Sequence, residues 1–207
     1  MGLSYLINLP FDKIEPNDRL IVLGLGKLSL ANYAQKNKIV AGIALMTHPS
    51  EWPQLCTDYP IAKYLQHSDW AKNVYVPYYG DDICDTWFAG IDTDEWKSKQ
   101  VEKQIDVLIY NKIRWDYNET KEELLDPIVK FLTSHNLSYK EIIYGQYNEK
   151  EYKELLNNCK SMIFLCTHES QGFACCEALS MNVPLFAWDQ SFCLDPNPLN
   201  WNDPIMP

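Results

Sequence analysis

The sequence has no cluster of positive charge. It contains 18 Lys and Arg residues against 28 Asp and Glu, and the formal net charge is −10. Nucleic-acid binding needs grouped cations that displace phosphate counterions, so this balance argues against a nucleic-acid partner and against an anionic membrane surface. No apolar run reaches the roughly 18 residues that a membrane-spanning helix requires. Residues 1–11 also lack the basic and apolar regions of a signal peptide.

The cysteines form no C-x-x-C pair, and their number, seven, does not suit a disulfide framework. Cys166 lies in an apolar run, where a reduced thiol packs as a small hydrophobic group. These features favour a reducing compartment, and we expect a cytoplasmic protein. We interpret Asp81, Asp82 and the acids of 91–95 as solvated loops, and we predict no metal site.

Several catalytic and cofactor motifs are missing. Gly24 and Gly26 lack the third glycine of a dinucleotide-binding fingerprint. The sequence contains no P-loop, no H-E-x-x-H pair and no G-x-S-x-G segment.

Short apolar runs alternate along the chain with longer amphipathic stretches. This alternation is typical of βαβ units and predicts an α/β fold with parallel sheets. In the first half we expect strands at 20–24, 39–46, 64–66 and 86–89. In the second half we expect strands at 106–110, 141–144, 162–166 and 183–188, with helices at 120–135, 149–158 and 171–181. The charged, polar stretch 96–105 predicts a linker between domains 1–95 and 106–207.

The segment 168–184 (HESQGFACCEALSMNVP) is the most informative. A strand ends, a turn with Gly172 follows, and a helix begins whose unpaired N–H groups and positive dipole end suit a phosphate. Glu177 shares a helical stripe with apolar residues, where a carboxylate needs hydrogen-bond donors such as sugar hydroxyls. Pairing with Lys or Arg, or exposure to solvent, is the alternative for Glu177. Glu169 follows the strand at the edge where α/β sheets bind ligands, or it is an ordinary acid at a helix start.

This segment resembles the donor motif of glycosyltransferase family 4, the "group 1" class of retaining GT-B enzymes. The matching residues are Glu169, Gly172, Phe173, Glu177, Ala178 and Pro184, and the departures are Gln171, Leu179, Ser180 and Asn182. The stretch 90–96 (GIDTDEW) is similar to the segment that closes the N-terminal domain in this class. The two matches occur in the family's order.

The resemblance implies roles for individual residues. Glu177 would bind the ribose hydroxyls, Glu169 would contact the transferred sugar, and the N–H groups near Gly172 and Phe173 would hold the diphosphate. The resemblance also implies that two cations after strand 106–110 neutralise the diphosphate, and that a His near the end of strand 39–46 faces the reacting sugar. The candidates are Lys112, Arg114 and His48; the family's five-residue spacing of the two cations is not kept. An exposed basic pair and a structural histidine are the alternatives.

By resemblance, the chain would be a metal-independent, hexosyltransferase-type enzyme of GT-B fold, with two Rossmann-like domains. It would move a sugar from a nucleotide-diphosphate donor to a carbohydrate, lipid or protein acceptor, with retention and without a cofactor. The first domain lacks counterparts of the early strands, so we expect a fragment or a reduced version of the fold. A nucleotide-sugar epimerase and a non-catalytic binding protein are the other hypotheses.

Overall fold

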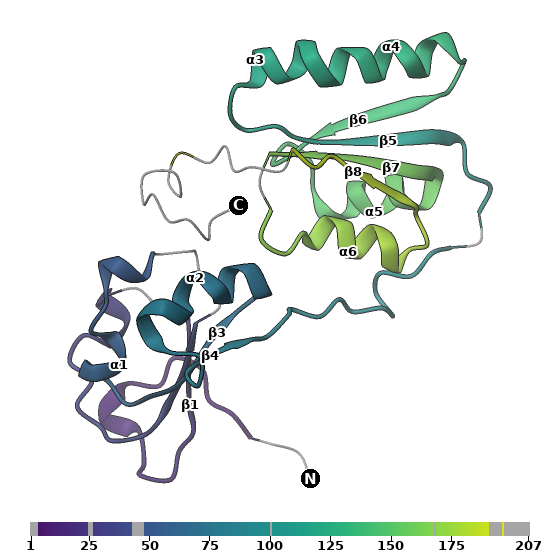
Figure 1. Cartoon of the computed structure of the whole chain (residues 1–207). Helices are drawn as coiled ribbons and strands as arrows, with labels where there is room; N and C mark the ends of the chain where they lie inside the picture. Colours follow the sequence, from purple (N-terminus) through teal and green to yellow (C-terminus); the bar gives the residue numbers. More distant parts are fainter. Residues whose placement is uncertain are drawn as a thin grey trace. The chain divides into compact units, whose positions relative to one another are not determined.

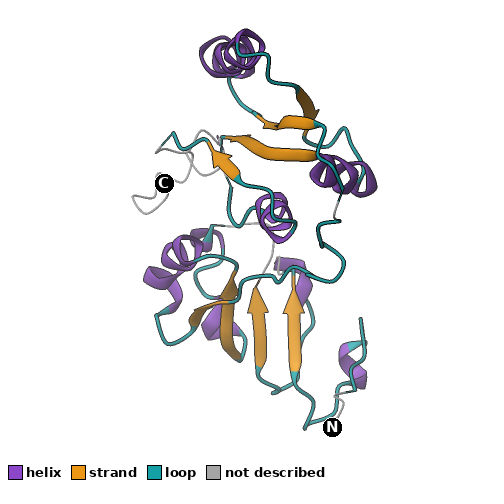
Figure 2. Ribbon diagram, turned by 90° about the vertical axis from the view of Figure 1, so that its right-hand side faces the viewer, coloured by secondary structure: helices purple, strands orange, loops and turns teal. Residues whose placement is uncertain are grey.

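The computed structural model describes residues 4–24, 27–42, 48–99, 101–167, 169–190 and 196. The chain divides into two compact units, the first ending at Phe88 and the second beginning at Ala89. Each unit contains one parallel four-stranded sheet (Figures 1 and 2). The helices in these ranges include none with the length and apolar character needed to cross a membrane.

The first unit forms its sheet from strands in sequence order, β1-β2-β3-β4. These strands are β1 Leu20–Leu23, β2 Ile39–Gly42, β3 Ile61–Gln66 and β4 Cys84–Thr86. The helices are α1 Leu55–Asp58 and α2 Asp69–Tyr79, with the 3-10 turns η1 Phe11–Lys13, η2 Lys27–Leu30 and η3 Pro49–Glu51. The side chains of α2 pack on β3 and build an aromatic core around Tyr64, Tyr75 and Tyr79.

The predicted strands of this unit are present, with two shifts. The strand predicted at 64–66 begins three residues earlier, at Ile61. The prediction at 86–89 was wrong by two residues at its start, since β4 begins at Cys84 and ends at Thr86. Cys84 is buried in the core, whereas Trp87 and Phe88 are exposed. The apolar residues in 86–89 therefore did not indicate a buried strand. β2 confirms the start of the strand predicted at 39–46; residues 43–47 lie outside the described ranges, as do Leu25 and Gly26.

The second unit has the strand order β6-β5-β7-β8. Its strands are β5 Ile105–Lys112, β6 Tyr139–Ile143, β7 Cys159–Cys166 and β8 Leu185–Ala187. One helical stretch between β5 and β6 comprises α3 Tyr117–Thr120, the π turn η4 Lys121–Leu125 and α4 Asp126–Ser134. The other helices are α5 Glu149–Asn158 and α6 Phe173–Ser180. All four predicted strands and three predicted helices are confirmed, with small shifts at their ends.

Sequence features explain where these helices begin and end. Asn148 caps α5 by accepting a hydrogen bond from the Glu151 N–H at 2.9 Å. Pro127 is the second residue of α4, which follows the π turn. Its ring and missing N–H disturb the regular helix at this point. Asn182 adopts the left-handed conformation, with φ 55°, just after α6, a position where asparagine commonly ends a helix.

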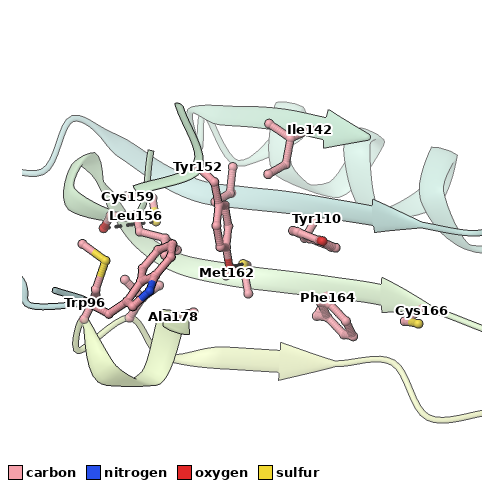
Figure 3. Close-up of a cluster of buried hydrophobic side chains, with 13 residues drawn as sticks. Trp96, Tyr110, Ile142, Tyr152, Leu156, Cys159, Met162, Phe164, Cys166 and Ala178 are labelled. Atoms are coloured by element: carbon pink, nitrogen blue, oxygen red, sulfur yellow. Dashed lines mark hydrogen bonds between the residues drawn. The ribbon is translucent and has the colours of Figure 1, made fainter. Parts of the chain in front are cut away.

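Two layers of helices cover the second sheet, one on each face. α3 and α4 lie on one side, over a cluster that includes Val107, Ile109 and Leu132. α5 and α6 lie on the other side, where Leu156 and Ala178 face the sheet (Figure 3). Successive strand residues point to opposite faces, so both faces of β5 are apolar. This explains why the sequence of β5 reads as a continuous apolar run.

Candidate functional site

The strand order of the second unit contains a reversal point. β5 is hydrogen-bonded to β6 on one side and to β7 on the other. The connection after β5 therefore runs over one face of the sheet, while the connection after β7 runs over the opposite face. Ligands of open α/β sheets bind at the carboxyl ends of the strands at such a point. The carboxyl ends here are adjacent, since Lys112 is in register with Cys166.

Lys112 and Glu169 meet at this edge. The Lys112 Nζ lies 2.6 Å from the Glu169 Oε2, and their side chains are only 13% and 29% exposed. The ammonium also lies 4.6 Å from the centre of the Tyr144 ring. Burial acts to lower the pKa of Lys112, but the hydrogen bond to Glu169 and its charge outweigh this effect, and the net pKa is raised. Lys112 is therefore a charged group at the reversal point.

The loop from Glu169 to α6 needs glycine at one position. Gly172 precedes the helix with φ +75°, a conformation that costs other residues free energy. A Cβ on Gly172 would approach the Glu169 Cγ to 3.3 Å. Phe173, the first helical residue, is half exposed. The first N–H groups of the helix have no acceptors within it, so this end is suited to an anion.

Glu177 lies one turn further along α6 and is partly buried. Loss of hydration, followed by repulsion from Glu149, raises its pKa from 4.5 to about 7. Among the residues with described positions, no hydrogen-bond donor and no cation pairs with its carboxylate. The hydroxyl of nearby Tyr152 donates instead to the Ala174 carbonyl at 2.7 Å. Of the two alternatives from the sequence, the ion pair is not found among the described residues, and the side chain is partly exposed to solvent.

Arg114 follows Lys112 by two residues. It is exposed, and its guanidinium lies 4.9 Å from the centre of the Trp115 ring. Sequence reasoning overlooked its neighbour Asn111, which is 1% exposed. The Asn111 amide donates to the Glu141 Oε1 at 2.8 Å, and its oxygen accepts from the Ile113 N–H at 3.1 Å. The available signal was a polar residue at the end of an apolar strand. Through the bond to the Ile113 N–H, Asn111 holds the chain just after Lys112.

Cys175, in the first turn of α6, also lies near Glu169. Burial, followed by the negative charge of Glu169, raises the pKa of its thiol to about 12. A cavity of about 440 Å³ lies elsewhere in this unit, between residues 94–99 and α5, and its lining includes both Lys and acidic side chains. Because the lining carries charges of both signs, this cavity has no preference for an anion. The candidate site is therefore the reversal point, where Lys112 and Glu169 meet.

His48 belongs to the first unit and is 2% exposed. Its Nδ1 accepts a hydrogen bond from the Ser50 N–H at 3.3 Å and lies 2.7 Å from the Ser50 Oγ, so it caps η3. Its ring packs edge-on against Tyr78. The structural interpretation accounts for these contacts, and the catalytic role stays a prediction. Within the described ranges, no group of three or more His, Cys, Asp or Glu residues suits a metal ion.

These sheets and their helices define a mixed α/β chain with Rossmann-like units. Among solved structures, the chain is similar to one in the GtfA/B complex, a glycosyltransferase of GT-B type, with a TM-score of 0.50 and 10% identity. The match covers 86% of this chain and 45% of that one, so this chain spans less than half of its neighbour's length. At this identity the likeness concerns the fold alone. No protein-family profile and no curated protein matches the sequence.

Proposed function

We propose that the second unit binds a nucleotide-diphosphate sugar and that the chain takes part in glycosyl transfer. The observation that carries the proposal is the contact of Lys112 with Glu169 at the reversal point of the sheet, beside the start of α6. A cation and a helix N-terminus suit a diphosphate, and a carboxylate next to them suits the hydroxyls of a sugar. The GT-B-like fold agrees with this use of the edge.

Each residue has a task in this proposal. Lys112 and the N–H groups after Gly172, beginning with that of Phe173, hold the diphosphate and stabilise the charge that grows on it as the bond to the sugar breaks. Glu169 accepts hydrogen bonds from the sugar. Glu177, half-buried and unpaired among the described residues, accepts hydrogen bonds from the ribose hydroxyls, which replace its lost hydration.

The finer parts of the proposal come from the family 4 resemblance. They are hexosyl transfer with retention, independence of metals and cofactors, a carbohydrate, lipid or protein acceptor, a cytoplasmic location and a role for His48 near the reacting sugar. Lys112 and Arg114 are only two residues apart, so the family's five-residue spacing of the two cations is not kept, and this favours a second candidate. That candidate is a protein that binds the nucleotide sugar without transferring it.

Calorimetric titration of the whole chain with UDP and GDP tests the proposal. We expect one of them to bind, and Glu177→Ala to weaken the binding about ten- to hundredfold, since hydrogen bonds to a charged group contribute roughly 1.5–3 kcal/mol. Glu154→Ala, which removes an exposed acid of α5, is the matched control.

Failure of a folded chain to bind either nucleotide would contradict the proposal. Unchanged affinity in Glu177→Ala would remove Glu177 from the site. For a chain that binds, product analysis with a nucleotide sugar separates three outcomes: transfer to an acceptor, an altered donor as an epimerase would give, and no reaction.

A further inference from the structure

Residues Ala89–Lys99 form a strap that lies on the second unit. Three side chains of this unit bond to the main chain of the strap. Gln171 donates from Nε2 to the Ala89 carbonyl at 2.7 Å and accepts from the Ala89 N–H at 3.3 Å. Ser180 donates to the Trp96 carbonyl at 2.7 Å. The Lys99 N–H donates to the Asn157 Oδ1 at 2.8 Å. The strap is thus fixed at its start, near its middle and at its end.

The strap also has its own local order. The Asp92 carboxylate accepts hydrogen bonds from the N–H groups of Asp94 and Glu95, each at 3.0 Å, and the Trp96 N–H donates to the Asp92 carbonyl at 2.8 Å. This turn places the Trp96 side chain in the core, where it is 6% exposed and lies near Tyr152 (Figure 3). A buried indole makes the strap costly to lift from the unit.

The three anchors are not placed at random. Gln171 immediately precedes the cap of α6, and Ser180 is its last residue, so the strap holds this helix at both ends. The loop that carries Glu169 and Gly172 lies between β7 and this helix. A shift of α6 along its axis would move that loop and would move Glu177 with it.

We infer that Gln171 is a positioning residue, whose amide ties the loop of Glu169 and Gly172 to the main chain of Ala89, so that nucleotide binding and the order of the strap are coupled. The inference rests on the proposed function. Ala89 is the first residue of the second unit, directly after the last residue of the first. Coupling between two sites is reciprocal. A nucleotide that orders the loop therefore also orders the strap, and loosening the strap weakens nucleotide binding.

Hydrogen exchange and calorimetry on the whole chain test the inference together. Gln171→Met keeps the length of the side chain and removes both hydrogen bonds. Gln104→Met is the matched control, because Gln104 is exposed in the same unit and no hydrogen bond of its side-chain amide is found among the described residues. We expect faster exchange of the Ala89 N–H in Gln171→Met only. We also expect its affinity for UDP or GDP to fall about three- to tenfold, as for one or two neutral hydrogen bonds.

In the wild-type chain, saturating nucleotide should slow exchange at Ala89, and in Gln171→Met this effect should disappear. Unchanged exchange at Ala89 in Gln171→Met would overturn the inference, and so would unchanged affinity. In both cases the proposed function would stand if the wild-type chain binds nucleotide. Absence of nucleotide binding by the wild-type chain would instead overturn the proposed function and the coupling with it, while the exchange in Gln171→Met would still report whether the tether exists.

Discussion

The two sheets contain the same number of parallel strands but differ in strand order. The first runs β1-β2-β3-β4 without a reversal, whereas the second, β6-β5-β7-β8, reverses between β5 and β7. Only a reversal sends neighbouring connections to opposite faces and opens the carboxyl edge between them. The comparison teaches that an edge for a ligand depends on strand order, and of the two described sheets only the second provides one.

Each unit also contains several lysine–carboxylate pairs. One pair from each unit shows how distance and exposure differ between them. Lys63 and Asp85 lie 3.3 Å apart in the first unit with side chains 42% and 54% exposed, whereas Lys112 and Glu169 are closer and less exposed. Exposed ion pairs contribute little to stability, about 0–1 kcal/mol, because water screens them. The pair in the second unit is the one whose loss should have consequences.

The largest expected effect comes from removing Lys112, and the removal of Lys63 in the first unit serves as the comparison. Lys112→Ala should weaken binding of a nucleoside diphosphate about ten- to hundredfold, since it removes a charged donor worth roughly 1.5–3 kcal/mol and leaves Glu169 unpaired. Lys63→Ala should leave this affinity unchanged. Calorimetry with UDP or GDP and with the matching nucleoside measures both variants. Equal losses for nucleotide and nucleoside would mean that the phosphates bind elsewhere.

A smaller effect follows from the raised pKa of Glu177. Its folded pKa, about 7, lies above its ordinary value of 4.5, so the folded chain keeps a proton that the unfolded chain releases. Stability is therefore lost as the pH rises from 4.5 to 7. Glu177→Gln should stabilise the chain at pH 8 by about 1 kcal/mol, after allowance for solvent screening, and should change little at pH 5. Urea unfolding at both pH values measures this, with the exposed Glu154→Gln as control.

The smallest effect separates backbone strain from the contact with Glu169. Gly172 and Gly145 both have positive φ, but a Cβ on Gly145 meets nothing within 4 Å. Gly145→Ala should cost about 1 kcal/mol of stability through strain alone. Gly172→Ala should cost the same amount and, in addition, weaken nucleotide binding, because Glu169 must shift. If the two variants bind nucleotide equally well, Gly172 does not shape the site.

Much of the second unit was predictable, because its strands and helices follow local rules. The apolar run of β5 and the capping residue Asn148 are local signals that mark their elements without any tertiary contact. The first unit was harder, since its exposed Trp87 and Phe88 mimic a buried strand. An apolar residue in the sequence is buried only where the fold places it in the core.

The residues proposed for the candidate site were named from the sequence, but their arrangement was not predictable. Lys112 and Glu169 are 57 residues apart, and Gln171 is 82 residues from Ala89, so no spacing in the sequence shows that they meet. Pairings of this kind depend on strand order, which local patterns do not determine.

The thiol of Cys175 has a practical consequence for handling the chain. Burial raises the pKa of this thiol to about 12, so it stays protonated at neutral pH. Only the thiolate reacts readily with peroxides or alkylating reagents. The first turn of α6 therefore resists oxidative damage at this cysteine, and a maleimide dye would spare Cys175.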